Sequence, residues 1–155
     1  MAVNLTQFGM VQIAGQVMDV NPTTISVTVS STSAPASGYL QAGDFVIFTP
    51  TDSSQSIRVA QCPSGTQADG IIIFNAKKNQ YNAYDNCEIA LNASIITVQA
   101  GGAFNRGVNL NYVPGTVTGQ LGSVFATGAA VFTAQSLDIA TAAGQIVRVL
   151  MNSRV

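Results

Sequence analysis

The chain has 155 residues, of which 47% are hydrophobic and 8% are charged, with a net charge of −1 and no histidine. An average soluble domain carries about 25% charged residues, so we expect much of this Ser-, Thr-, Asn-, Gln-, Ala- and Gly-rich surface to lie against other proteins. The apolar content excludes a chain that is disordered throughout, and a zinc site would lack its usual His and Cys-x-x-Cys ligands.

The first 20 residues alternate weakly between apolar and polar side chains. We expect them to form an N-terminal arm or an edge strand of a single β domain that spans residues 1–155. They have neither a basic segment nor a continuous apolar core, so they do not resemble a signal peptide. No apolar run approaches the roughly 20 residues that a membrane-spanning helix needs. We therefore expect synthesis in a cytoplasm and no membrane partner.

The next segments predict short strands that are separated by turn residues. Residues 22–29 place Ile and Val alternately with Ser and Thr after an Asn-Pro turn, which indicates a half-buried strand. Residues 31–38 have the composition of a loop. The continuous apolar run 45–48 predicts a heavily buried strand. A further strand is expected where Ile57 and Val59 would share one face.

The middle of the chain continues this pattern. Residues 70–76 predict a core strand, and the polar, Tyr-containing segment 77–86 predicts a long connection or an edge. Residues 87–98 predict two more strands. The alternation over 108–112 is the clearest of all, because Val, Leu and Tyr alternate with Asn before a Pro-Gly turn. Another strand is expected at 128–134.

The C-terminal segment resembles a short helix followed by a strand. Residues 137–143 are rich in Ala, but isolated short helices are marginally stable, so we expect a loop or a single turn. The closing strand is predicted at 146–150, with Val147 and Val149 toward the core and Arg148 toward solvent or a neighbour. Because no stretch has an amphipathic helical period, the fold class predicted is all-β, a β-sandwich or a jelly-roll or β-tulip-like barrel with little helix.

Two segments resemble each other: both 42–48 and 143–149 begin with Ala, Gly and a polar residue before an apolar strand. Glycine can adopt a positive φ in the turn that begins a strand. We interpret the likeness as shared turn chemistry rather than as an internal repeat. Cys62 and Cys87 are expected to be free and reduced, although one disulfide between them stays open.

The sequence does not favour an enzyme. Acid–base catalysis most often uses His, which is absent, and Glu88 is the only glutamate. The six aspartates stand mostly beside turn residues, although a catalytic pair such as Asp44 and Asp138 is a rival hypothesis. The Gly-rich segments lack the residues of a phosphate-binding loop. We expect no catalytic residue, no cofactor and no metal.

Protein contacts are the more promising chemistry. Six Lys and Arg are dispersed along a chain of low isoelectric point, so we expect no nucleic-acid partner. Tyr and Arg are enriched at protein interfaces because they combine buried area with hydrogen bonding. The candidate interface residues are Tyr81, Tyr84, Arg106, Tyr112, Arg148 and Arg154.

Residues 108–150 carry a Pro-Gly turn after a strand, a Gly-Ala-Ala segment, then Leu-Asp-x-Ala-x-Ala-Ala-Gly-Gln and Ile-Val-Arg-Val. This part resembles the capsid decoration, or structural cement, proteins of tailed bacteriophages. The resemblance implies an accessory virion protein on the outer surface of the head, acting as a homotrimer that clamps neighbouring major capsid subunits. The major capsid protein would then be its partner.

Two other classes stay open. One is another virion structural protein, such as a tail or fibre component, although long fibres usually show sequence repeats. The other is a carbohydrate-binding β-sandwich, which is weakened by the absence of Trp, a residue that commonly stacks on sugars.

Overall fold

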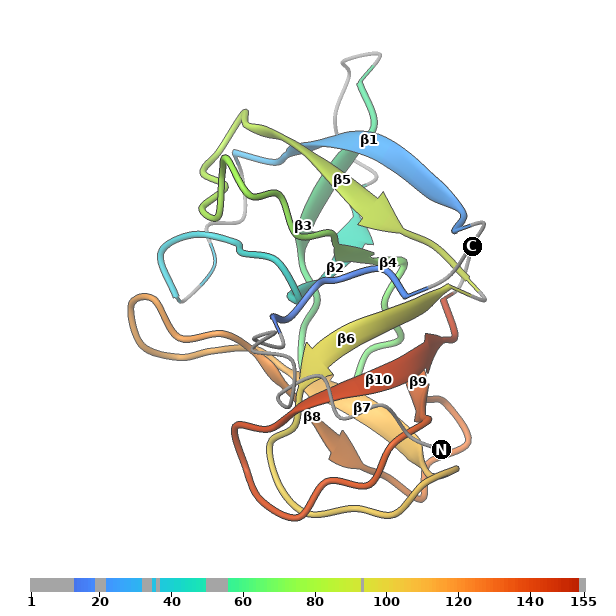
Figure 1. Cartoon of the computed structure of the whole chain (residues 1–155). Coiled ribbons are helices and arrows are strands. Elements are labelled where there is room, and N and C mark those ends of the chain that lie inside the picture. The colour runs from blue at the N-terminus through green and yellow to red at the C-terminus, as the bar shows by residue number, and fades with distance from the viewer. Residues whose placement is uncertain are drawn as a thin grey trace.

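The computed structural model describes residues 13–18, 22–31, 35, 37–49, 56–92 and 94–153, and none of these residues lies in a helix. The all-β class predicted from the sequence is therefore confirmed (Figure 1). The ten strands are β1 (Thr24–Val29), β2 (Phe45–Phe48), β3 (Arg58–Gln61), β4 (Gly70–Ile72), β5 (Asn86–Ala90), β6 (Ile95–Gln99), β7 (Asn109–Val113), β8 (Ser123–Ala126), β9 (Ala134–Ser136) and β10 (Ile146–Met151).

The first five strands form a small closed barrel in the order β1-β3-β2-β4-β5. The barrel closes where β5 pairs antiparallel with β1, from Thr24 opposite Ala90 to Thr28 opposite Asn86. β1 and β3 form a short parallel pair, and the other pairs of the barrel are antiparallel. Closure satisfies the backbone groups that an open sheet would leave unpaired.

The last five strands form an antiparallel sheet in the order β6-β10-β9-β7-β8. Its two outer strands approach each other at one corner, because the Gly101 amide donates to the Val124 carbonyl over 2.8 Å. Next to this contact, Gln99 donates from its amide to the Ser123 hydroxyl over 2.9 Å. The sheet is therefore rolled up, and a hydrogen bond between two neutral side chains supports the contact between its outer strands.

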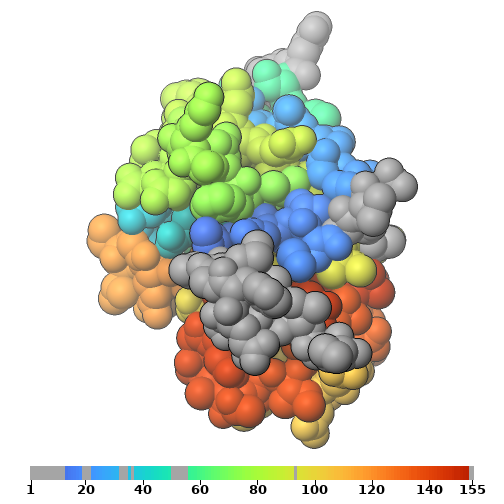
Figure 2. Space-filling model, viewed as in Figure 1, coloured from blue at the N-terminus to red at the C-terminus, as the bar shows by residue number. Residues whose placement is uncertain are grey.

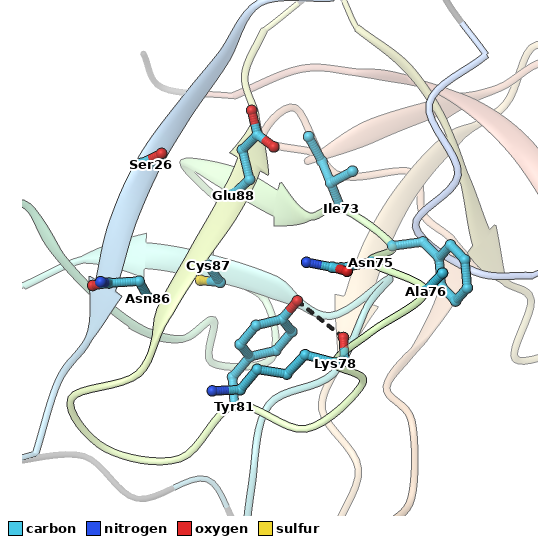
Figure 3. Close-up of a pocket in the computed structure, with 10 residues that line it drawn as sticks. Ser26, Ile73, Asn75, Ala76, Lys78, Tyr81, Asn86, Cys87 and Glu88 are labelled. Carbon is cyan, nitrogen blue, oxygen red and sulfur yellow. Dashed lines mark hydrogen bonds between the residues drawn. The ribbon is translucent and has the colours of Figure 1, made fainter.

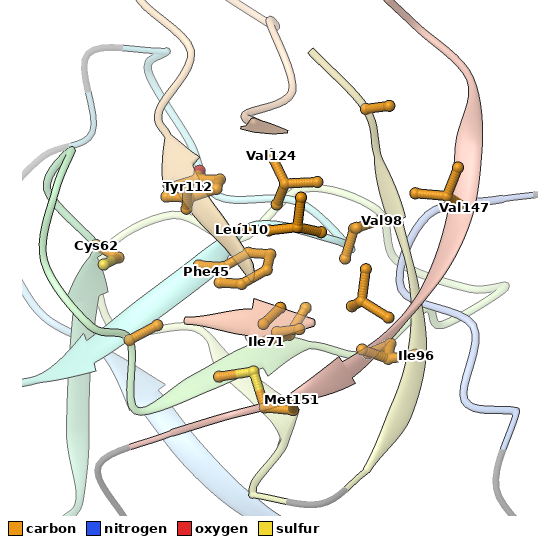
Figure 4. Packing of buried hydrophobic residues seen from close by; sticks show 14 of the residues in the cluster. Phe45, Cys62, Ile71, Ile96, Val98, Leu110, Tyr112, Val124, Val147 and Met151 are labelled. Carbon is orange, nitrogen blue, oxygen red and sulfur yellow. The ribbon is translucent and has the colours of Figure 1, made fainter. Parts of the chain in front are cut away.

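Neighbouring residues of the barrel strands enter two different cores. Phe45 on β2 and Ile71 on β4 pack into a cluster shared with the C-terminal sheet, whereas Val46 and Ile72 pack inside the barrel. Figure 4 shows the shared cluster, where Phe45 and Ile71 meet residues of the C-terminal sheet. Because successive side chains of a strand point to opposite faces, both faces of these strands are buried. This explains the continuous apolar runs that predicted them.

Residues 13–18 join the two sheets. The Gly15 amide donates to the Thr97 carbonyl on β6 over 2.6 Å, and the Gly15 carbonyl accepts from the Phe74 amide near the barrel over 2.8 Å. Val17 forms an antiparallel bridge with Ile96. In Figure 2 this dark-blue segment lies between the green barrel and the red C-terminal sheet. The described part of the predicted N-terminal arm thus pairs along the edge of β6, and the rest of residues 1–20 lies outside the described residues.

One turn design occurs five times in the described chain. In each copy, the side-chain oxygen of the fourth residue accepts a hydrogen bond from the backbone amide of the first, over 2.8–3.4 Å. The third residue has a positive φ, which is Gly in four copies and Tyr84 in one. This confirms that the likeness between 42–48 and 143–149 is shared turn chemistry. The five turns span residues 13–16, 41–44, 82–85, 117–120 and 142–145.

Two predictions about local structure are wrong. Residues 128–134 are mostly a connection rather than a strand, and Val131 within it is half exposed. The strand lies earlier, at β8, where Val124 is buried and pairs with Tyr112 of β7. Ile57 does not share the buried face of Val59, because it precedes β3 and is half exposed. In both cases an apolar residue lies in a connection, where no facing element covers it.

The closing segment matches its prediction. Residues 137–143 form bends and a single bridge, without a helix. Val147 and Val149 on β10 are buried, and Arg148 between them is exposed.

Candidate functional site

Two of the predicted interface tyrosines are buried within the chain. Tyr112 is 0% exposed and Tyr81 is 2% exposed, so neither side chain lies on the surface. Tyr112 occupies an inward position of β7, and its ring stacks on Phe45 of β2 at 4.8 Å between ring centroids. These two residues are core residues, which corrects the prediction that they contact a partner. Arg154 lies outside the described residues.

A buried carboxylate connects the barrel with the C-terminal sheet. Asp44 is fully buried and accepts hydrogen bonds from the Tyr112 hydroxyl (2.7 Å), the Gly122 amide (3.1 Å) and the Gln41 amide (2.9 Å). Burial raises the pKa of Asp44 above its usual range, and the three donors oppose that shift. The group is enclosed by its own chain, so it cannot reach a substrate. The rival hypothesis of a catalytic pair of Asp44 and Asp138 gains no support from this geometry.

A polar concavity of about 450 Å³ opens on the barrel beside β1 and β5 (Figure 3). Its wall includes Lys78, whose ammonium group lies 3.1 Å from the Asp85 carboxylate and over the ring of Tyr81. The Tyr81 hydroxyl donates to the Lys78 carbonyl over 3.2 Å. A backbone hydrogen bond from Asn82, followed by the bond with Lys78, lowers the pKa of Asp85. Lys78 and Asp85 are therefore paired with each other, and Glu88, which also lines the concavity, accepts a hydrogen bond from the Thr24 hydroxyl over 3.1 Å.

The thiol in this concavity is buried and lacks the features of a reactive cysteine. Cys87 is buried and free, and burial raises the pKa of its thiol to about 12. Reactive cysteines have lowered pKa values and exposed sulfur atoms. Cys62 is also fully buried, and neither cysteine forms a disulfide, as the sequence predicted for both. Among the residues that the structure describes, no group of three or more His, Cys, Asp or Glu could hold a metal ion.

Tyr84 is the most exposed of the large apolar residues described, at 65%. It is also the one non-glycine residue in the described ranges with a positive φ, at 68°. The guanidinium group of Arg58 lies 5.3 Å from its ring centroid. An aromatic side chain in a strained turn position is accessible to a partner, and its interface role stays a prediction.

The remaining predicted arginines come together at the end of the C-terminal sheet. Arg148 makes a bidentate contact with Asp138, at 2.6 Å from Nη2 to Oδ1 and 3.0 Å from Nε to Oδ2. The hydrogen bond with Arg148 is the main cause that lowers the pKa of Asp138, and the charge of Arg106 adds to it. Arg106 is exposed on the preceding turn.

The sequence analysis named Asp138 only as a rival catalytic residue and did not predict its contact with Arg148 at this surface. The sequence positions of Asp138 and Arg148 on either side of a turn could have predicted their contact. The turn at 142–145 separates two antiparallel segments, and Asp138 and Arg148 flank it at similar distances. The Leu137 amide accordingly donates to the Arg148 carbonyl over 3.0 Å. Residues that flank a turn in this way face each other.

No described residue belongs to a helix that is long and apolar enough to cross a membrane. No protein-family model and no curated protein matches the sequence. Among solved structures, the chain is similar to the N base of the head fibre gp8.5 of bacteriophage phi29, with a TM-score of 0.56 and 16% sequence identity. The alignment covers 84% of this chain and 93% of that chain. At this identity, the likeness shows a shared fold.

Proposed function

We propose that this chain is a structural protein of a bacteriophage virion, the base domain by which a head fibre is attached to the outside of the head. The observation that carries the proposal is the shared fold with the base of a phage head fibre, since the alignment spans most of both chains. Fold alone does not determine function, so the properties of the surface also have to agree with the proposed role.

Those properties support a protein-binding role. Charged residues make up 8% of the chain, and unpaired charges that are buried at an interface cost several kcal/mol. Charged pairs such as Lys78 with Asp85 and Arg148 with Asp138 are matched within the chain. The described residues offer a polar concavity, but burial raises the pKa of its thiol and its lysine is paired.

A cement protein is the second candidate. Residues 108–150, which span β7 to most of β10, carry the pattern that resembles capsid decoration proteins. Both candidates bind the outside of a head, and they differ in the consequence. A cement protein that binds only the assembled shell stabilises that shell by mass action, whereas a fibre base needs only to remain attached.

Attachment by several copies at once would strengthen either role. Linked binding sites act at a high effective concentration, so an oligomer can bind firmly through individually weak contacts. We propose a homotrimer on the major capsid protein. Light scattering of the purified chain measures its mass, and a stable monomer would contradict this part of the proposal.

Binding to heads tests the proposed function. The purified chain is incubated with expanded heads that lack it, and with unassembled major capsid protein, and the mixtures are sedimented. We expect the chain to sediment with heads only. Heat release of DNA then separates the two candidates: a cement protein raises the release temperature of the heads, and a fibre base leaves it unchanged. A chain that stays in the supernatant with both targets refutes the proposal.

A further inference from the structure

Three charged side chains form a line across three neighbouring segments at the end of the C-terminal sheet. Phe104 and Ala140 form an antiparallel bridge, with hydrogen bonds of 3.0 Å in both directions. Extending this register by two residues places Arg106 opposite Asp138. On its other side, Asp138 accepts the bidentate contact from Arg148 on β10. The order across the surface is therefore Arg106, Asp138, Arg148.

This line contains every charged residue between residues 89 and 153 of the sequence. The other 62 residues of this range are uncharged, so the line concentrates the charge of this part of the chain. Two guanidinium groups against one carboxylate leave one positive charge. A surface that concentrates its few charges in one place favours a partner of opposite charge there.

The side chains of Arg148 and Asp138, and the backbone beside Arg106, are held in place before any partner arrives. Arg148 is fixed by its two-point contact with Asp138, and the Arg148 amide donates to the same carboxylate over 2.9 Å. Arg106 lies beside Gly107, whose amide donates to the Ser136 carbonyl over 2.9 Å. Side chains that are already ordered lose less entropy on binding. The Arg148 side chain is still 47% exposed, so its remaining donors are accessible.

An exposed apolar residue adjoins this line in the sequence. Ile139 follows Asp138 directly and is 56% exposed. Interface hot spots typically combine Arg with a neighbouring apolar anchor that excludes water around the charged contact. The charged line and Ile139 together form a surface that we call the arginine end, defined by Arg106, Asp138, Ile139 and Arg148.

We propose that the arginine end binds a carboxylate-bearing protein surface on the outside of the phage head. The guanidinium groups of Arg106 and Arg148 donate charge-assisted hydrogen bonds to Asp or Glu carboxylates of the partner, and Ile139 is buried in the contact. The inference rests on the proposed function and names the surface by which the chain would bind the head. Charge complementarity selects an acidic patch of the shell as the occupant.

Binding of variants to heads tests this inference. Arg106→Ala and Ile139→Ser are compared with two matched controls from other surfaces, Lys77→Ala on the barrel and Val117→Ser, whose side chain is 61% exposed. We expect each arginine-end variant to weaken head binding about tenfold or more and each control less than about twofold. Circular dichroism and thermal melts confirm that all four variants are folded.

The dependence of head binding on salt concentration provides a second measurement. Raising NaCl from 50 to 500 mM weakens binding of the parent chain, and the Arg106→Ala variant shows a smaller dependence on salt. If the parent chain binds heads and the arginine-end variants bind equally well, the inference is overturned and the proposed function stands. If the parent chain does not bind heads, both are overturned. If Arg106→Glu instead dissociates an oligomer of the chain in light scattering, the occupant is a second copy and the inference is overturned.

Discussion

The hydroxyl of Tyr112 on β7 and the carboxylate of Asp44 beside β2 are 2.7 Å apart, and their hydrogen bond joins the C-terminal sheet to the barrel. Both groups are fully buried, and Asp44 follows Gly43 in one of the recurring turns. The side chain of this aspartate thus closes its own turn through Gln41 and also holds the second sheet through Tyr112 and Gly122.

Two variants that remove this contact are expected to destabilise the chain to different extents. Tyr112→Phe keeps the stacking on Phe45 and loses one hydrogen bond to a buried carboxyl group, which costs about 1.5–3 kcal/mol. Asp44→Ala leaves three buried donors without their acceptor and costs more, about 3–5 kcal/mol. Urea unfolding measures both, with Tyr84→Phe as the exposed control. A Tyr112→Phe value equal to that of the control would show that the hydrogen bond contributes nothing.

The same aspartate predicts an unusual dependence of stability on pH. Burial raises the folded-state pKa of Asp44 above its ordinary value of 3.8. At a pH between the pKa of Asp44 in the unfolded state and its higher pKa in the folded state, the folded state binds more protons than the unfolded state. The contribution of Asp44 to the free energy of unfolding therefore falls as pH rises through this range. Asp85 and Asp138 have lowered pKa values and act in the opposite sense, losing stability as pH falls below 3.8.

Comparison with Asp44→Asn separates these effects. Because the other carboxyl groups are common to both proteins, the difference in unfolding free energy between parent and variant isolates Asp44. We expect this difference to move in favour of the variant as pH rises from about 3.5 to 8. A difference that stays constant over this range would mean that the pKa of Asp44 is the same in both states.

The contact between two glycine turns gives a prediction about packing. A Cβ added to Gly15 would lie 2.7 Å from the Ile72 carbonyl oxygen and 2.9 Å from the Gly43 nitrogen. Both are backbone atoms, so relief requires the barrel and residues 13–18 to separate. Gly15→Ala should therefore destabilise by about 2–4 kcal/mol. Gly144→Ala has a similar positive φ and open space around it, so it should cost only about 1 kcal/mol.

The difference between these two variants in thermal or urea unfolding measures the packing contribution, since the backbone strain is common to both. Equal losses of stability would show that the strain alone accounts for the effect and that the two turns do not pack closely.

The thiols provide a chemical measure of burial. Cys62 and Cys87 are buried and form no disulfide, and burial raises the pKa of Cys87 to about 12. At pH 8 and without denaturant, we expect neither to react with a thiol reagent such as DTNB within minutes. In denaturant, two thiols per chain should react at once. Detection of fewer than two would indicate a disulfide, and rapid reaction of the folded chain would show that the barrel opens easily.

How far the sequence alone predicts this molecule depends on which interactions are local. The alternation in 108–112 predicted β7, because the side-chain period reports directly which face is buried. The apolar segment 128–134 led to a wrong prediction of a strand. Apolar residues such as Val131 can also lie exposed in a connection, so composition alone does not show that a segment is buried. Tyr112 was wrongly assigned to an interface because its partner Asp44 is 68 residues away in the sequence. No local sequence pattern indicates such a contact. Arg106 and Arg148 were candidates by composition, but Asp138, which links them, required the register between segments.

Tyr84 gives a final prediction, because it occupies a turn position that is Gly in the four other copies. A positive φ costs a non-glycine residue about 1–2 kcal/mol, and the contact of its ring with Arg58 offsets part of that cost. Tyr84→Ala keeps the strain and loses the ring contact, whereas Tyr84→Gly loses the contact and removes the strain. We expect the Gly variant to be more stable than the Ala variant by about 0.5–1 kcal/mol. At Ala83, whose φ is not positive, the order should be reversed, with Ala83→Gly less stable than the parent chain. Urea unfolding of the three variants measures both differences. If Ala is preferred at both positions, the turn relaxes on substitution, and Tyr84 is not held in a strained conformation.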